Sequence, residues 1–438
     1  ILLDFNYTCE TLNFSRNVTG KDTAMTYVLT QVGAKKFIEC AMKSVIEIAQ
    51  QLPVPDISFN LNLGVTTLQF WMKDIKFNDF TVSHAFTDFQ ENYSVQVGLL
   101  DCWAFMSLQW GFRQMSYPYL TDQGEGKIFM SGANLKGVID TEKDEDCPGH
   151  FKTLLRQIVL DFESLKVELS GGSSWIYQSL VNFILEALQS QLSEVISAIL
   201  VKSIQIIANF FIGNDAFYAY YKEHLVLKDE RFTDKWQVGT GYIGFLISGY
   251  VFKNEHLDDE YIKPQMLNKI TLNKVNQEIS YSIHESAFNN MFYIFHKYYD
   301  QFSTPKIKVL EMPTAKIMNA NFLFDFKIQV ENEVVNVKLT GKPKWKSDIR
   351  FNNQSLLNDH ITVVYFDFKA YTNDYKGNKI DINAVIQEFI THLDKAVEDS
   401  GYQINITPFV DMQTFTPMFD GGDRVLRLVG YNPEVCPE

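Results

Sequence analysis

The sequence has few cysteines, and their spacing matches no common metal or redox site. Five are present, and no two form a CxxC pair: Cys9, Cys40, Cys102, Cys147 and Cys436. A zinc knuckle or a thioredoxin-type dithiol is therefore not expected. Proline and glycine are also modest, at 12 and 23 of 438 residues, which excludes a collagen-like or low-complexity chain.

Basic residues are outnumbered by acidic ones, 39 against 53, for a net charge of −14. Nucleic acid is therefore excluded as a partner, because phosphate binding needs a dense Lys/Arg footprint. Charge-driven docking on anionic lipid is weakened for the same reason. A long uninterrupted apolar run is missing too. The most apolar stretch, residues 195–212, contains polar residues such as Lys202 and Asn209, so we expect no membrane-spanning helix.

Catalytic motifs are incomplete. The GxGxxG pattern at 239–244 precedes a segment that predicts a strand, whereas dinucleotide binding needs a helix there. His284-Glu285 begins an HExxH motif, but Phe288 stands where the second zinc ligand belongs. The acidic run at 140–146 lacks the glycine and final glutamate of an EF-hand loop. We expect neither an enzyme, nor a catalytic cofactor, nor a metal site.

Aromatic residues are abundant, with 35 Phe, 21 Tyr and 6 Trp. Hydrophobic residues make up 46% of the chain, which is typical of a globular protein, and the length predicts two or three domains. Six glycosylation sequons begin at Asn6, Asn13, Asn17, Asn92, Asn353 and Asn405. Because three fall within the first nineteen residues, we expect a secreted or luminal glycoprotein. The chain starts at Ile1, so we also expect a processed amino terminus.

The order of elements is similar in the two halves. Apolar periodicity predicts helices at 34–51, 174–211, 286–300 and 383–398. Alternating and β-branched segments predict antiparallel strands between 57 and 169, and again between 236 and 430. We therefore expect an amino-terminal domain at 1–212, a connector at 213–235 and a carboxy-terminal domain at 236–438.

Several segments resemble one known family. They are Leu52–Ile57 (LPVPDI), Asp74–Phe80 (DIKFNDF), Cys147 and Leu165–Tyr177 (LKVELSGGSSWIY). Their order and spacing resemble the bactericidal/permeability-increasing and lipopolysaccharide-binding protein family, which includes plasma lipid-transfer proteins. The resemblance is sharpest over residues 30–205 and weaker beyond them.

The resemblance implies an α+β fold of two tubular barrels, each a twisted antiparallel sheet wrapped around a long helix. It further implies a boomerang arrangement with a central sheet, and an apolar pocket in each barrel for the acyl chains of a phospholipid. We expect the amino-terminal pocket to be lined by Phe37, Ala41, Val45, Ile48, Leu180, Ile184 and Leu188. Phe389, Leu393 and Val397 should line the carboxy-terminal pocket.

Two features depart from the family. The family joins a cysteine at the position of Cys147 to one in the long helix, but Ser193–Ile204 contains none. Cys102 begins one predicted strand and Cys147 follows the strand expected to pair beside it, so we expect a Cys102–Cys147 disulfide, whose Cα atoms must lie within about 7 Å. We also expect Cys9–Cys436 and a free Cys40; five reduced thiols are the alternative. The basic tip of the antimicrobial members is missing as well, since residues 59–71 and 103–112 contain no Lys or Arg. For membrane contact we expect aromatic rings instead, those of Trp71, Trp103, Phe105, Trp110 and Phe112.

The sequence thus predicts a non-enzymatic protein that binds or transfers lipid, with phospholipids and, transiently, a membrane or lipoprotein surface as its partners. Two alternatives remain open. One is a structural or interaction subunit that keeps the fold without exchanging lipid. The other is an endotoxin-binding defence protein.

Overall fold

The computed structural model describes most of the chain. The described residues are 22–51, 53–62, 64–90, 94–143, 151–171, 191–205, 218–221, 226–253, 267, 278–350, 359–399, 401–406 and 415–430. The chain forms two units. As far as they are described, the first comprises Ile1–Asn6, Lys35–Asp140 and Thr153–Ile212, and the second comprises Tyr7–Ala34, Thr141–Lys152 and Gly213–Glu438.

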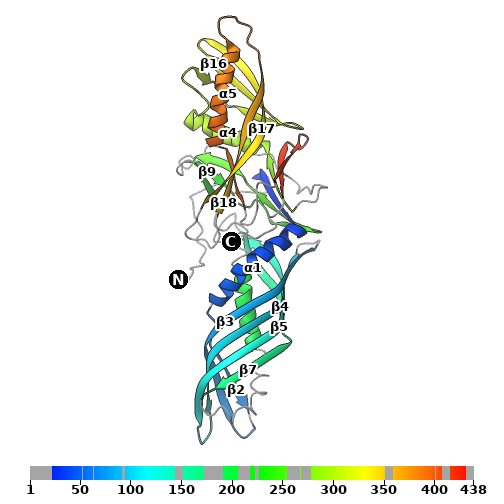
Figure 1. Ribbon diagram of the computed structural model, residues 1–438, viewed down its shortest axis with the longest axis vertical. Coiled ribbons are helices and arrows are strands. Elements are labelled where there is room, and N and C mark those ends of the chain that lie inside the picture. The colour runs from blue at the N-terminus through cyan, green and yellow to red at the C-terminus, as the bar shows by residue number, and fades with distance from the viewer. Residues whose placement is uncertain are drawn as a thin grey trace. The chain divides into compact units, whose positions relative to one another are not determined.

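The first unit is built on one antiparallel sheet with the strand order β2-β3-β4-β5-β6, in which β7 also pairs with β5. Its strands are β2 (Ile57–Asn62), β3 (Thr67–Gln90), β4 (Ser94–Gln114), β5 (Thr121–Lys143), β6 (Phe151–Asp161) and β7 (Ser164–Ser170). Side chains alternate between the two faces, as in β3, where Leu68, Phe70 and Met72 are all buried. Figure 1 shows β3, β4 and β5 running side by side as long slanted strands.

The long strands β3 and β4 each contain an irregularity where the sequence predicts an end. The predicted segments 66–72 and 77–86 form the single strand β3, and 93–100 and 103–112 form β4. The register shifts between Lys73 and Lys76, where Asp74 has a φ of 51°. A similar shift surrounds Asp101, also at 51°, whose backbone N–H donates to Asn134 Oδ1 at 3.1 Å. These sites are β-bulges, which bend a strand without ending it.

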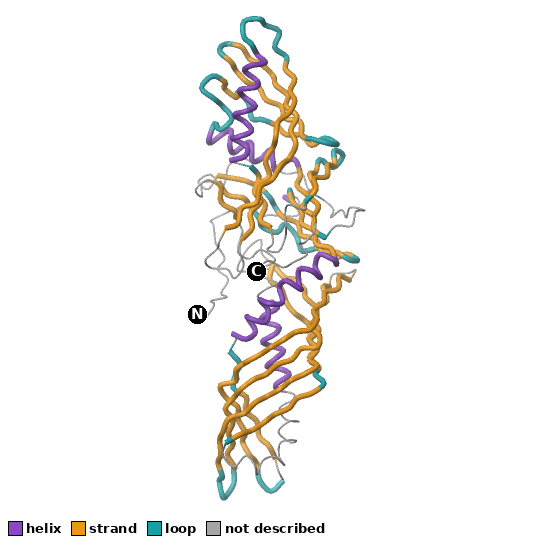
Figure 2. The backbone as a smooth tube through the Cα atoms, in the orientation of Figure 1, coloured by secondary structure: helices purple, strands orange, loops and turns teal. Residues whose placement is uncertain are grey.

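Two helices pack on the sheet of the first unit. They are α1 (Gln31–Gln51) and the helix at 191–205. Figure 2 shows both lying along the same curved sheet, and their buried side chains share one hydrophobic cluster with it. The helix predicted at 34–51 is therefore confirmed.

The second unit contains three sheets. The first has the order β10-β11-β1-β13-β21-β20, the second β12-β9-β8, and the third β14-β16-β17-β18-β19, with β15 paired to β16. The strands of the first are β1 (Met25–Thr30), β10 (Gln237–Gly239), β11 (Tyr242–Ile247), β13 (Ile279–His284), β20 (Thr416–Asp420) and β21 (Val425–Gly430). Those of the second are β8 (Tyr218–Tyr221), β9 (Val226–Asp229) and β12 (Tyr250–Lys253). The third contains β14 (Ile307–Val309), β15 (Thr314–Ile317), β16 (Phe322–Val330), β17 (Glu333–Arg350), β18 (Asp359–Asn373) and β19 (Tyr402–Ile406).

The limits of the units differ from the boundaries predicted from sequence. Strand β1, near the amino terminus, pairs with β11 on one side and β13 on the other, so it belongs to the second unit. Residues 213–235, predicted as a connector, supply β8 and β9 to the three-stranded sheet of the same unit. The segment was predicted as a connector because it is rich in charged residues. Strands that contain buried charges do not show the alternation of apolar and polar residues by which a strand is normally recognised in sequence.

Helices α4 (Glu285–Tyr299) and α5 (Ile382–Asp399) complete the second unit and confirm the helices predicted at 286–300 and 383–398. Helix α4 begins at an unusual cap. The His284 side chain accepts a hydrogen bond from the Ser286 backbone N–H at 3.1 Å, and its Nδ1 lies 2.7 Å from the Ser286 hydroxyl. Since Nδ1 accepts, the capping imidazole is neutral. Burial, with a smaller effect of Arg424, lowers the pKa of His284 from 6.5 to about 4.

The cap predicts a pH dependence of stability. Between pH 4 and 6.5 the unfolded chain binds the His284 proton more tightly than the folded chain does. Stability from this group is therefore complete above pH 6.5 and is lost as the pH falls to about 4, by roughly 3 kcal/mol in total. The measurement is urea unfolding of the second unit at several pH values, compared with His284→Asn, which keeps a capping acceptor that does not titrate. His296, whose pKa burial also lowers, is present in both proteins. Identical pH slopes would contradict the prediction.

Cys102 corrects the predicted disulfide pattern. In the structure its thiol is free and only 1% exposed, on the inner face of β4 beside Ala133 of β5. Burial, aided by Asp101, raises its pKa to about 12. The predicted Cys102–Cys147 bridge is therefore wrong, because the Cys102 side chain points into the core. Cys9, Cys147 and Cys436 lie outside the described residues, so the Cys9–Cys436 bridge stays a prediction.

Most predicted glycosylation sites also lie outside the described residues, namely Asn6, Asn13, Asn17, Asn92 and Asn353. Asn405 is in β19, where its backbone pairs with Ile361. Among the described residues, no helix combines the length and apolar character needed to cross a membrane.

Candidate functional site

The interior of the first unit is the strongest candidate site. The inner face of its sheet is lined at the centre by side chains that are small or flexible, each at most 1% exposed: Met72, Ala104, Met106, Met130 and Ala133. Methionine has three rotatable bonds and adapts to irregular shapes. This part of the sheet therefore presents an apolar surface that can adjust to what lies against it.

Helix α1 faces this surface with one apolar stripe. Ala49 is 1% exposed and belongs to the cluster, whereas Met42 and Ile46 pack against it while remaining half-buried. Ile46 and Ala49 lie four and seven residues after Met42, so the three side chains are on one face of the helix. The pocket lining predicted on this helix from sequence was the neighbouring stripe, in which each of Ala41, Val45 and Ile48 precedes a residue of the observed stripe by one position. Of its members, Val45 and Ile48 are buried at 3% and 2% but lie outside this cluster.

The helix at 191–205 adds apolar side chains to the same interior. Leu192, Ile196 and Leu200 are at most 1% exposed in the same cluster, while Val195 and Ile204 pack on it half-buried. Both helices therefore keep apolar side chains that touch the interior and are still partly accessible. Of the other predicted lining residues, the side chains of Phe37 and Ala41 and the whole of Leu180, Ile184 and Leu188 lie outside the described residues.

An aromatic stack closes the interior toward one end of the sheet. Trp110 lies nearly parallel to Phe70 and Phe112, with ring centroids 6.1 and 6.5 Å away. Its Nε1 donates to the backbone oxygens of Glu125 (2.9 Å) and Ser170 (3.2 Å). Trp110 is 1% exposed and Phe112 is 4% exposed. These two residues therefore pack in the core, which corrects the prediction that their rings contact a membrane.

The other three predicted membrane residues lie at different positions. Trp71, Trp103 and Phe105 are half-buried, and the Phe105 ring stacks on Phe129 at 5.0 Å. They occupy the strand face opposite to Met72, Ala104 and Met106, because neighbours in a strand alternate. Nothing in their packing sets them apart as a contact surface.

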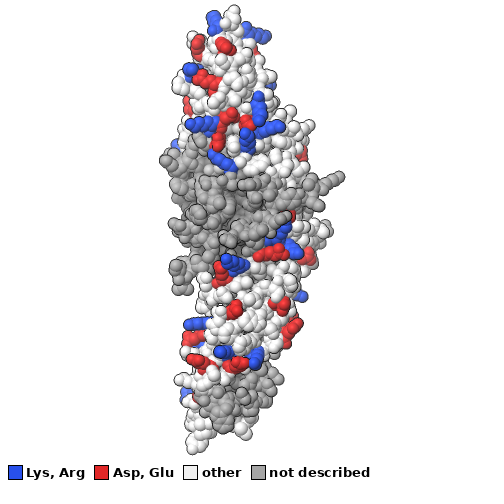
Figure 3. Space-filling view, in the orientation of Figure 1, with Lys and Arg blue, Asp and Glu red and all other residues white. Residues whose placement is uncertain are grey.

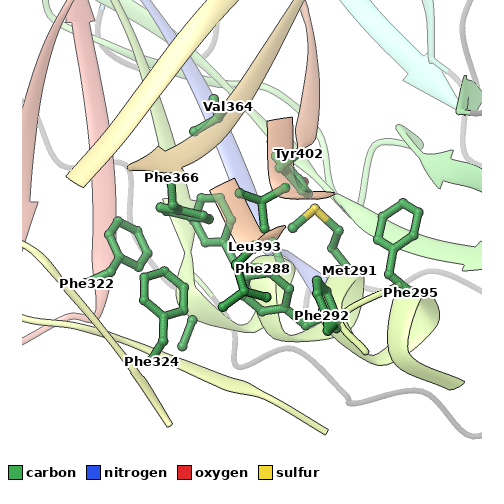
Figure 4. Packing of buried hydrophobic residues seen from close by; sticks show 14 of the residues in the cluster. Phe288, Met291, Phe292, Phe295, Phe322, Phe324, Val364, Phe366, Leu393 and Tyr402 are labelled. Atoms are coloured by element: carbon green, nitrogen blue, oxygen red, sulfur yellow. The ribbon is translucent and has the colours of Figure 1, made fainter. Parts of the chain in front are cut away.

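The interior of the second unit is filled differently, by rings. Phe366 is the centre of this cluster, with ring centroids 5.4 Å from Phe288, 4.7 Å from Phe322 and 4.9 Å from Phe324. Figure 4 shows these rings converging with Leu393 and Tyr402. All six side chains are at most 1% exposed. Aromatic side chains thus occupy the space between α4, α5 and the sheet.

The predicted carboxy-terminal lining belongs to this cluster. Phe389 and Leu393 are fully buried and Val397 is 2% exposed. The Phe389 ring meets Phe326 edge-on, at 5.4 Å and 90°. The structure therefore brings the three residues together as predicted, but what surrounds them is other side chains. Their packing does not favour a lipid pocket at this place.

A buried charge network, which the sequence analysis missed, lies at β9 in the second unit. Lys228 is fully buried, with its ammonium bonded to Glu230 and 4.8 Å from the ring centroid of Tyr402. Burial lowers the pKa of Lys228 and raises the pKa of Glu230. The next pair is Asp229 and Arg231, joined at 2.9 Å through Nε and at 2.8 Å through Nη2.

The network is fully partnered, since the Ser248 hydroxyl also donates to Asp229 at 3.1 Å and Lys228 Nζ lies 3.8 Å from Met25 Sδ. Two acids and two bases leave no net charge. The arrangement joins β9 to β1, β19 and the β11–β12 turn and is best understood as structural. Its signal in sequence, the run KDER at 228–231, resembles any exposed charged turn.

The catalytic motifs rejected from sequence fall in ordinary structural positions. Gly239, Gly241 and Gly244 lie in the β10–β11 hairpin, where Gly241 has a φ of 79°, so no helix follows them. His284 and Glu285 form the start of α4, and Glu285 Oε2 accepts from the Ile317 backbone N–H at 3.0 Å. Within the described part of the chain, no cluster of acidic, histidine or cysteine side chains is arranged to hold a metal ion.

Comparison with known protein families finds no match, and comparison with curated protein sequences finds none. Among solved structures, the chain is similar to the crystal structure of lipopolysaccharide binding protein, with a TM-score of 0.57 and 12% identity, covering 94% of this chain and 99% of that one. Two weaker similarities are to Takeout 1 of Epiphyas postvittana (TM-score 0.29, 14% identity, 44% and 94% coverage) and to P47 of Clostridium botulinum A2 (TM-score 0.23, 9% identity, 96% and 100% coverage).

The first of these similarities shows the fold. The chain has an α+β fold like that of lipopolysaccharide binding protein, and the sequence-based prediction of that fold is confirmed. The two closed barrels and their boomerang arrangement stay predictions.

Proposed function

We propose that the protein binds lipid in the interior of its first unit, with the acyl chains between the sheet and the two helices. The observation that carries the proposal is the half-buried state of Met42, Ile46, Val195 and Ile204, which pack against the interior cluster and still retain accessible apolar surface. In the second unit, by contrast, Phe288, Met291 and Phe292 of α4 are at most 1% exposed. The partly buried side chains of α4 that pack on this second cluster are tyrosines, Tyr293, Tyr298 and Tyr299, so α4 offers no half-buried aliphatic surface of this kind.

The chemistry of the interior favours acyl chains over polar ligands. Its lining is apolar, with aliphatic and thioether side chains and, toward one end, the rings of Phe70, Trp110 and Phe112. Burial from water gains about 0.8 kcal/mol per CH₂ group. A chain of about sixteen carbons then gains roughly 12 kcal/mol, before the cost of its lost freedom. The fold shared with lipopolysaccharide binding protein supports a lipid as the ligand. We propose a phospholipid, held at one molecule per chain, because rings fill the second interior.

Native mass spectrometry of the purified protein, followed by lipid extraction, tests the proposal. We expect one phospholipid per chain. Replacing Ile46 with tryptophan should lower the lipid occupancy by more than half, because the larger ring takes the accessible space beside α1. The matched control is Val32→Trp on the same helix, where the side chain is 58% exposed, and occupancy should not change.

Two outcomes would contradict the proposal. One is purified protein that holds no lipid and takes none up from labelled phosphatidylcholine vesicles. The other is a folded Ile46→Trp variant with full occupancy. The first outcome favours the alternative of a structural subunit, for which the aromatic filling of the second unit is the supporting observation. Transfer between membranes, rather than storage, would appear as exchange of labelled lipid between two vesicle populations. Secretion and glycosylation are further parts of the proposal and are tested by enzymatic deglycosylation of the native protein.

A further inference from the structure

Two loops meet at one end of the first unit. One, between β2 and β3, includes residues 64–66, and the other joins β4 to β5 at 115–120. The Met115 backbone N–H donates to the Thr67 carbonyl at 2.9 Å, and the Thr66 and Ser116 hydroxyls lie 2.7 Å apart. Within the second loop, the Gln114 N–H donates to the Leu120 carbonyl at 2.7 Å. Figure 2 shows both loops at the same end of the sheet. These bonds hold the loops as one surface.

The surface is apolar and strongly exposed. Its large hydrophobic side chains are Val65 (94% exposed), Met115 (54%), Tyr117 (85%), Tyr119 (59%) and Leu120 (55%). They are five of the ten exposed large hydrophobic side chains among the described residues, so they form a cluster and are not scattered singly. We refer to these five residues as the apolar tip. The Tyr117 and Tyr119 rings are perpendicular to each other, with centroids 6.4 Å apart.

The apolar tip carries no charge. Residues 57–72 and 114–121 contain no Lys, Arg, Asp or Glu, although the chain as a whole has a net charge of −14. In Figure 3 the described surface at the very end of this unit is white. A partner recognised through ion pairs has nothing to pair with here. Tyrosine, with an apolar ring and a polar hydroxyl, suits the boundary between acyl chains and head groups.

We propose that the apolar tip docks the protein on zwitterionic phospholipid bilayers by inserting Val65, Met115, Tyr117, Tyr119 and Leu120 into the interfacial layer. Figure 2 shows the two loops as turns that protrude at the end of the sheet, and protruding apolar side chains can insert into a fluid bilayer. Lack of charge at the tip, within an acidic protein, fits a membrane without net charge. This docking does not depend on lipid being held in the interior. We propose the apolar tip as the membrane-contact surface in place of the aromatic residues predicted from sequence.

Vesicle flotation with pure phosphatidylcholine vesicles tests the docking. The double variant Tyr117→Ser, Leu120→Ser should bind vesicles at least tenfold more weakly than the wild type. The control is Val159→Ser, a substitution of a 51% exposed residue on β6 of the same unit, and it should bind as the wild type does. Binding should change little between low and physiological salt, because screening acts on charges and not on apolar burial.

Four results would overturn the proposal, and the first three concern the wild type and the control variant. They are wild-type protein that does not float with the vesicles, binding that collapses with added salt, and an equal loss in the Val159→Ser control. Circular dichroism and the lipid content by native mass spectrometry are measured on every variant. A double variant that stays folded, keeps its lipid and loses vesicle binding supports docking and separates it from lipid binding in the interior. A folded double variant that still binds vesicles fully would also refute the apolar tip.

Discussion

Replacing Asp229 with alanine is expected to destabilise the second unit by about 3–5 kcal/mol, among the largest effects of any single substitution in the chain. Asp229 is 1% exposed and accepts two hydrogen bonds from the Arg231 guanidinium, one from the Arg231 backbone N–H and one from Ser248. Its removal leaves the Arg231 cation buried without its carboxylate. Taking an unpaired charge out of water is costly, so the loss exceeds the value of the bonds themselves.

The test is calorimetric unfolding of wild type, Asp229→Ala and the double variant Asp229→Ala, Arg231→Met. Removing both charges leaves no buried cation that has lost its carboxylate, and the double variant should recover at least half of the lost stability. If the single variant lost less than 1 kcal/mol, water would have to reach Arg231, and the network would not be buried as the structure has it.

Replacing Phe366 with alanine should have a comparable effect, through a different mechanism. The ring contacts four others, those of Phe288, Phe292, Phe322 and Phe324, at centroid distances between 4.7 and 6.2 Å. Truncation of a buried phenylalanine costs about 3–5 kcal/mol, since both the transfer free energy and the packing around the cavity are lost. The neighbouring rings are fixed from several sides and cannot collapse into the space.

Two variants calibrate this prediction by chemical denaturation. Phe366→Leu keeps most of the volume and should lose about half as much stability as the alanine variant. Val334→Ala changes a 52% exposed side chain in the same unit and should change stability by less than about 0.5 kcal/mol. A loss below 1 kcal/mol for Phe366→Ala would mean that the cluster is loosely packed and has room for a ligand.

The helices and the fold class were predictable because periodicity survives in a single sequence. Helix α5 shows this well, since Ile386, Phe389 and Leu393 are spaced on one face and all are fully buried. The orientation of α1 was less predictable. Apolar residues occupy two adjacent stripes, 41-45-48 and 42-46-49, and periodicity alone does not say which of them meets the sheet.

The sequence did not predict which polar and aromatic side chains are buried, because the residues that surround them are distant in the chain. Nothing near Lys228 in sequence reveals that Tyr402 and Met25 enclose its side chain. Trp110 was predicted at a surface because Trp suits an interface, but the residue is buried and its indole N–H donates to the backbone oxygens of Glu125 and Ser170. The apolar tip was missed because its residues sit in turns, where no periodic pattern exists to separate inside from outside.

The placement of β1 affects how the chain is made and how it can be divided. Residues 25–30 are synthesised more than two hundred residues before the strands on either side of them, β11 and β13. This sheet can therefore complete its β11-β1-β13 pairing only after residue 284 has been synthesised, and its β13-β21 pairing only after residue 430. Loop-closure entropy grows only with the logarithm of length, so the delay affects the rate of folding more than the final stability. A fragment that begins at 213 would lack the strand between β11 and β13 and expose two unpaired strand edges, which invite pairing with other chains.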